Sequence, residues 1–125
     1  KYKALLSRFD CTKDTAVDVK YTVINTDEKK ILNDNAKVYF APEVINSEAR
    51  TIINWEKADI YSLAQVCIYL LSGKTTCDPQ ESLEILDESD INEDTKYIIL
   101  EMLSENPEER PSIKEILNCI NNITK

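Results

Sequence analysis

The chain has 125 residues, the size of one modest domain, and 42% of them are hydrophobic, enough to form a buried core. It contains no histidine and only one glycine, Gly73. These absences exclude a Ser-His or Cys-His nucleophile pair and a glycine-rich phosphate loop within this chain. No run of about 18 apolar residues is present, so we expect no membrane insertion.

The four cysteines, Cys11, Cys67, Cys77 and Cys119, show no C-x-x-C spacing. Without histidine, this spacing argues against a zinc site, and we expect neither a metal nor another cofactor. We expect the thiols to be reduced and the protein to be cytoplasmic. Because Lys1 is not an initiator methionine, we also expect the chain to be a piece of a longer protein.

The formal net charge of −8 arises entirely in the C-terminal half. Residues 1–73 carry ten acidic and ten basic side chains, whereas residues 78–109 carry twelve acidic side chains against a single Lys96. Such a segment repels nucleic acid. It is either a solvated face that maintains solubility or a surface that attracts a basic protein partner. The candidate partner-binding residues are Glu81, Glu84, Asp87, Glu88, Asp90, Glu93 and Asp94.

The first third of the chain predicts short strands followed by loops. Residues 4–6 are a brief apolar run, and residues 17–24 alternate between β-branched or aromatic and polar side chains, which is typical of a strand. We expect the two to form a small antiparallel ribbon. Residues 25–38 are polar and without period, Pro42 starts a short helical turn, and residues 45–55 are predicted to be an irregular loop.

Residues 58–71 are apolar almost all round and predict the central core helix, ended by Gly73. Such a helix has to be surrounded by protein. We therefore expect an upstream segment of the same protein or a partner chain to cover the side that this chain leaves open.

Three further helices carry clear start signals. Asp78 precedes a helix that ends near Asp87, and Asn92 caps the next one. Ser112 and Glu115 form a capping box in front of an apolar stripe made by Ile113, Ile116, Leu117 and Ile120. The predicted fold is mainly α, with the small β-ribbon at the N-terminal end.

Three motifs occur in a specific order and spacing. They are Tyr39-Phe40-Ala41-Pro42-Glu43, Asp59-Ile60-Tyr61-Ser62-Leu63 and Asn106-Pro107-Glu108-Glu109-Arg110-Pro111-Ser112. Together they resemble the second half of a protein-kinase C-lobe, over residues 3–125. The resemblance implies a single kinase C-lobe-like domain over residues 1–125, with a β-ribbon at 1–24, a degenerate activation-segment region at 25–56 and a helical core at 57–125.

The same resemblance assigns structural roles to three residues. Glu43 and Arg110 match a buried carboxylate–guanidinium pair that clamps two remote segments, a geometry that suits arginine and not lysine. Asp59 matches an aspartate that accepts hydrogen bonds from the backbone of the catalytic loop.

The positions that would hold magnesium in a kinase carry unsuitable residues. Val23 stands where the metal-binding aspartate would be, and Lys3 stands where the second ligand, an asparagine, would be. Valine cannot ligate a metal, and a lysine ammonium repels Mg²⁺. We therefore expect no enzymatic activity.

A kinase lobe without its chemistry resembles the KIND domain, the kinase non-catalytic C-lobe module. The stretch Val23-Ile24-Asn25-Thr26-Asp27-Glu28 adds to this resemblance. It implies a protein-interaction module, as in the Spir actin nucleators, where the module binds the basic tail of a formin through an acidic surface. We expect a basic, helical partner segment and a role in cytoskeletal regulation. The alternative is the C-terminal part of a pseudokinase with a signalling or scaffolding role.

Overall fold

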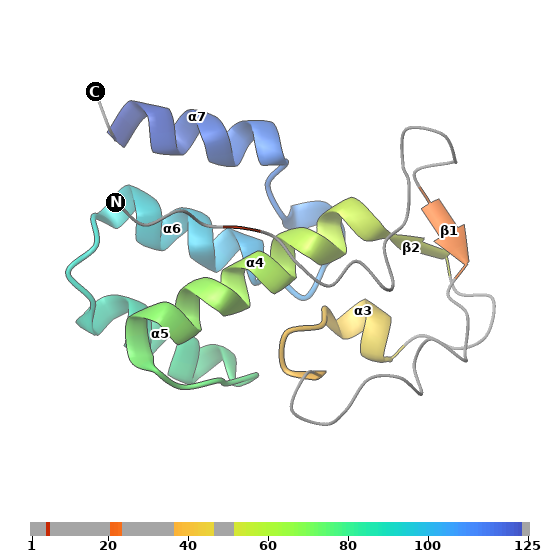
Figure 1. Cartoon of the computed structure of the whole chain (residues 1–125), viewed down its shortest axis with the longest axis horizontal. Helices are drawn as coiled ribbons and strands as arrows, with labels where there is room; N and C mark the ends of the chain where they lie inside the picture. The colour runs from red at the N-terminus through yellow and green to blue at the C-terminus, as the bar shows by residue number, and fades with distance from the viewer. Residues whose placement is uncertain (1–4, 6–20, 24–36, 47–51, 124–125) are drawn as a thin grey trace.

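The computed structural model describes residues 5, 21–23, 37–46 and 52–123. This part of the chain is mainly helical, as predicted from the sequence (Figure 1). In chain order its elements are β1 (Tyr21–Val23), α3 (Pro42–Ile45), β2 (Ile52–Asn54), α4 (Trp55–Ser72), α5 (Pro79–Glu88), α6 (Glu93–Met102), the 3₁₀ helix η1 (Pro107–Glu109) and α7 (Ile113–Ile123).

The central helix is α4, as the sequence predicts. Helices α5 and α6 pack against it and against each other, and α7 packs on α6 (Figure 1). Ile60, Ala64 and Ile68 lie one turn apart on the same side of α4, so they enter one core. The buried side chains that complete this core are Leu86, Ile99, Met102 and Ile116.

A second, smaller core joins α3 and β2 to the N-terminal half of α4. Ala41 and Val44 from the α3 segment and Ile53 from β2 pack with Ala58 and Tyr61 of α4. Pro42 occupies the first turn of α3, where its missing N–H costs no hydrogen bond. The two cores meet at Leu103, which packs against both.

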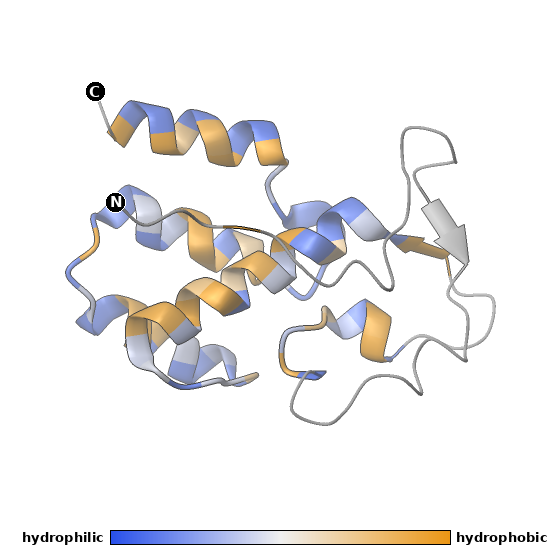
Figure 2. Ribbon diagram, in the orientation of Figure 1, coloured by the Kyte–Doolittle hydropathy of each residue, from blue (hydrophilic) through white to orange (hydrophobic). Residues whose placement is uncertain are grey.

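One face of α4 remains exposed. The apolar residues of α4 surround the helix, as predicted (Figure 2). However, Leu63 and Val66 are exposed, and Leu70 retains 75% of its accessible surface. The described residues therefore cover α4 only in part, and the expectation that an upstream segment or partner chain covers the rest stays a prediction.

The helix ends follow the predicted capping signals. The Asp78 carboxylate accepts from the Gln80 N–H at 3.0 Å, and the Asn92 side chain accepts from the Thr95 N–H at 2.8 Å. In the capping box, the Ser112 N–H donates to Glu115 at 2.6 Å, and the Glu115 N–H donates to the Ser112 hydroxyl at 3.2 Å. Two hydrogen bonds from Ser112 lower the pKa of the Glu115 carboxyl.

The predicted β-ribbon within residues 1–24 is not confirmed. Residues 4 and 6 lie outside the described residues, and Leu5 is not in a strand. The backbone of β1 pairs antiparallel with β2, so Val23 lies opposite Ile52. The loop predicted over residues 45–55 was therefore wrong at its end, because Ile52–Asn54 is a strand and Trp55 begins α4. A three-residue strand that depends on a distant partner leaves too short a pattern to recognise.

Gly73 ends α4 in the left-handed conformation, with φ at +69° and its N–H bonded to the Tyr69 carbonyl at 2.7 Å. A Cβ placed on this residue would meet no atom within 4 Å, so only backbone strain opposes a side chain here.

We expect Gly73→Ala to lower the free energy of unfolding by about 1–2 kcal/mol. Gly73→Asn is the control, because asparagine tolerates this conformation better. Chemical denaturation measures both, and an equal loss for the two variants would contradict the explanation.

Candidate functional site

The predicted pair between Glu43 and Arg110 is present. Arg110 Nη1 and Nη2 donate to the two oxygens of Glu43 at 2.6 and 2.8 Å, which is the bidentate arrangement. The side chain of Arg110 is fully buried and that of Glu43 retains 18% of its accessible surface. This contact joins α3 to the turn that follows η1, across 67 residues of sequence.

Backbone carbonyls bind the remaining donors of Arg110. Nε donates to the Ser104 carbonyl at 2.8 Å, Nη1 donates to the Lys57 carbonyl at 2.9 Å, and Nη2 donates to the Glu105 carbonyl at 3.4 Å. All five N–H groups of the guanidinium therefore have acceptors. In return, the Lys57 ammonium donates to the Arg110 carbonyl. The guanidinium also lies over the Tyr61 ring, with Cζ 5.1 Å from its centroid.

Asp59, the third residue of this structural set, lies in the second turn of α4 and is exposed. Burial against the surrounding protein nevertheless raises the pKa of its carboxyl above the ordinary 3.8. No described residue donates a hydrogen bond that offsets this effect. The role in accepting backbone hydrogen bonds stays a prediction.

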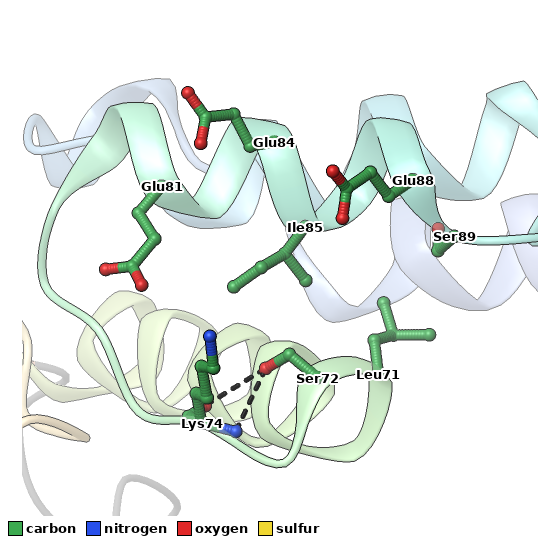
Figure 3. A pocket seen from close by; sticks show the side chains of 8 residues that line it. All are labelled: Leu71, Ser72, Lys74, Glu81, Glu84, Ile85, Glu88 and Ser89. Carbon is green, nitrogen blue, oxygen red and sulfur yellow. Dashed lines mark hydrogen bonds between the residues drawn. The ribbon is translucent and has the colours of Figure 1, made fainter.

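A groove lies between α5 and the end of α4 (Figure 3). Its volume is about 450 Å³. Glu81, Glu84 and Glu88 line it from α5, where positions i, i+3 and i+7 share one side of the helix. Ile85 points from α5 toward Leu71 and the C-terminal end of α4 (Figure 3). We call it the α4–α5 groove.

Among the described residues, Lys74 is the one basic residue that lines the α4–α5 groove. The Ser72 hydroxyl accepts from the Lys74 N–H at 3.1 Å and donates to the carbonyls of Ile68 and Lys74 at 2.8 and 3.2 Å. These bonds fix the chain as it leaves α4. Three carboxylates against one ammonium make the groove negative, and Ile85 and Leu71 supply the apolar side chains of a mainly polar lining.

The α4–α5 groove divides the seven predicted acidic residues into two sets. Glu81, Glu84 and Glu88 share the α4–α5 groove, whereas the other four lie outside its lining. Glu93 pairs with the Lys96 ammonium at 3.1 Å, and the same ammonium donates to the Asp87 carbonyl at 3.4 Å. Asp90 and Asp94 are exposed near the start of α6. Leu71, Lys74 and Ile85 were not predicted as site residues, although an isoleucine one residue after Glu84 signals an apolar position beside the acidic edge.

The prediction that Lys3 and Val23 cannot hold a metal stays a prediction. Lys3 lies outside the described residues, and Val23 is placed only through its backbone in β1. In the described part of the chain, no group of three or more histidine, cysteine, aspartate or glutamate side chains is placed to hold a metal ion. Among the helices described, none is long and apolar enough to span a membrane.

The sequence was also compared with known proteins. No protein-family model matches it, and no curated protein shows a significant match.

We expect Arg110→Ala to lower the free energy of unfolding by about 3–5 kcal/mol, because the Glu43 carboxylate would lose its buried partner. Arg110→Lys should recover little of this loss, since one ammonium cannot serve acceptors that surround a planar guanidinium. Urea denaturation of the three proteins measures the effect. A lysine variant as stable as the parent would show that charge alone is required.

We expect Asp59→Asn to raise the Tm near pH 7. Because the folded-state pKa of Asp59 is raised, the charged form opposes folding above that pKa, and the penalty disappears as the pH falls below the ordinary value of 3.8. The Tm difference between variant and parent should therefore vanish near about pH 3. A thermal melt series across pH measures it, and a difference that is independent of pH would refute the electrostatic explanation.

Proposed function

We propose that this chain is a non-catalytic protein-interaction module, similar to a KIND domain, that binds a basic helical segment of a partner protein in the α4–α5 groove. The observation that carries the proposal is the groove itself. It brings two apolar side chains, Ile85 and Leu71, together with three carboxylates from α5. The resemblance to the KIND domain of the Spir actin nucleators implies partner binding through an acidic surface, and it favours a role in cytoskeletal regulation.

The geometry suits an amphipathic helix. Such a segment can place one or two apolar side chains against Ile85 and Leu71 and direct lysine or arginine toward the carboxylates. Most of the affinity would come from the apolar contact. The opposed charges would mainly raise the association rate and select basic partners.

Two observations support the kinase-like identity that the proposal assumes. The bidentate Glu43–Arg110 contact joins the motifs that begin at Tyr39 and Asn106. The remaining motif, Asp59-Ile60-Tyr61-Ser62-Leu63, lies in α4, the helix on which the core is built. Val23 and Lys3 at the metal positions support a module without phosphoryl-transfer chemistry.

The C-terminal part of a pseudokinase is the second candidate. The specific observation in its favour is the stretch Pro107-Glu108-Glu109-Arg110-Pro111-Ser112, which reads more like an ordinary kinase than the rest of the chain does. Both candidates are non-catalytic, and both leave the α4–α5 groove available as a docking surface.

The proposal predicts that charge reversal within the groove slows partner association. The probe is a fluorescent, amidated helical peptide with lysine on one face and leucine on the other. Stopped-flow fluorescence measures its association rate at about 50 mM and about 300 mM salt. For the triple variant Glu81→Lys, Glu84→Lys and Glu88→Lys, we expect an association rate about tenfold lower at the lower salt and a smaller effect at the higher salt.

The matched control reverses three acidic residues that lie outside the groove: Asp87→Lys, Asp90→Lys and Asp94→Lys. It makes the same change in net charge, so general attraction of a cationic peptide affects both variants equally. Equal rates for the two variants would show that the acidic segment is only a solvated face. Thermal melts of both confirm that folding is retained.

A further inference from the structure

A second hollow lies on the other side of α5. Pro79 and Ser82 line it, at helix positions that face away from Glu81, Glu84 and Glu88. Its volume is about 260 Å³. Tyr61 and Gln65 of α4, Leu100 of α6 and Leu103 directly after α6 form much of its wall. Cys77, which is exposed, also lines it. We call it the Tyr61 pocket.

The Tyr61 pocket has an apolar wall and a polar base whose hydrogen bonds are already made. Gln65 is 3% exposed and donates from Nε2 to the Tyr61 hydroxyl at 3.0 Å. Burial raises the pKa of Tyr61, so this hydroxyl stays neutral. Among the described residues, no buried polar side-chain atom lacks a hydrogen-bond partner. An apolar side chain can therefore enter without displacing a required bond.

The rim of the pocket is acidic. Glu105 lines the pocket, and an adjoining hollow that shares Leu100 and Ser104 with it is lined by Glu101 and Glu109. The Glu109 carboxylate accepts from the Ser104 hydroxyl at 2.8 Å, which holds it beside the opening. Among the described residues the one guanidinium is that of Arg110, which is buried and paired with the Glu43 carboxylate.

We propose that the Tyr61 pocket is a second docking site, which receives one apolar side chain of a partner's basic segment while flanking lysine or arginine side chains face Glu101, Glu105 and Glu109. Charge complementarity at the acidic rim favours this occupant, as does an apolar pocket large enough for one side chain. The proposal rests on the proposed function in taking a basic segment as the ligand. It assigns that segment a second contact, distinct from the α4–α5 groove.

Cys77 provides a local reporter. In a protein with Cys11→Ala, Cys67→Ala and Cys119→Ala, N-ethylmaleimide labels only Cys77. The probes are two amidated peptides of equal lysine content, one with a leucine between the lysines and one with glycine in its place. At about ten times its Kd, the leucine peptide should slow Cys77 labelling about tenfold, because about one protein in eleven remains free. The glycine peptide at the same concentration should protect far less.

Two variants separate this site from the α4–α5 groove. Glu101→Lys with Glu105→Lys should abolish the protection, whereas the triple reversal of Glu81, Glu84 and Glu88 should leave it once the peptide is saturating. Unchanged labelling with the leucine peptide, equal protection by both peptides, or protection that survives the Glu101 and Glu105 reversal would overturn the second site. If protection is lost only in the variant that reverses Glu81, Glu84 and Glu88, the second docking site would be overturned, but the proposed function would stand. If the peptide still protects Cys77 while the triple reversal in the α4–α5 groove and its matched control associate at equal rates, the Tyr61 pocket would stand as a docking site and the α4–α5 groove would not.

Discussion

The arrangement of this chain depends on one buried charge. A guanidinium removed from water needs an opposite charge and an acceptor for every N–H group, and Arg110 has both. Its acceptors come from α3, from the first turn of α4 and from the turn after α6. None of these groups can move independently without leaving an N–H group unpaired in the interior. Arg110 is therefore a constraint on geometry more than a source of net stability.

Helix α4 connects the contacts of Arg110 with both proposed docking surfaces. Arg110 lies over the Tyr61 ring, and the Tyr61 hydroxyl accepts from Gln65 at the base of the Tyr61 pocket. From there Ile68 continues along α4 in the main core toward Leu71 and Lys74 at the α4–α5 groove. Both hollows are therefore formed on packed helices, which hold side chains in place better than loops do.

The sequence predicts those parts of the fold that depend on local chemistry. Pro79 after Asp78, the Ser112–Glu115 box and Gly73 each mark a helix end because the signal and its hydrogen bond lie within a few residues. The Glu43–Arg110 contact spans 67 residues and was predictable only through the motif resemblance. The strand at Ile52–Asn54 was missed because its partner lies about thirty residues earlier in the chain, where no local pattern marks it.

The acidic segment shows the same limit for the candidate site. Composition identifies residues 78–109 by their excess of acidic side chains, but it does not show which of these share a surface. Helical geometry places Glu81, Glu84 and Glu88 at the α4–α5 groove, while Glu93 pairs with Lys96. Which apolar side chains accompany the carboxylates depends on how α5 packs against α4. That information lies in tertiary contacts, so Leu71, the Tyr61 pocket and its rim could not be inferred from composition or spacing.

Native-state hydrogen exchange of a Glu43→Gln variant tests the central claim most directly. Glutamine keeps the size of the side chain and removes the charge that Arg110 requires. If Arg110 couples the three segments, the amides of α3, of residues 55–58 and of residues 104–110 should lose protection together, by the same free energy, while the core of α4, α5 and α6 changes less. Loss of protection in α3 alone, or a uniform loss over the whole chain, would contradict the account.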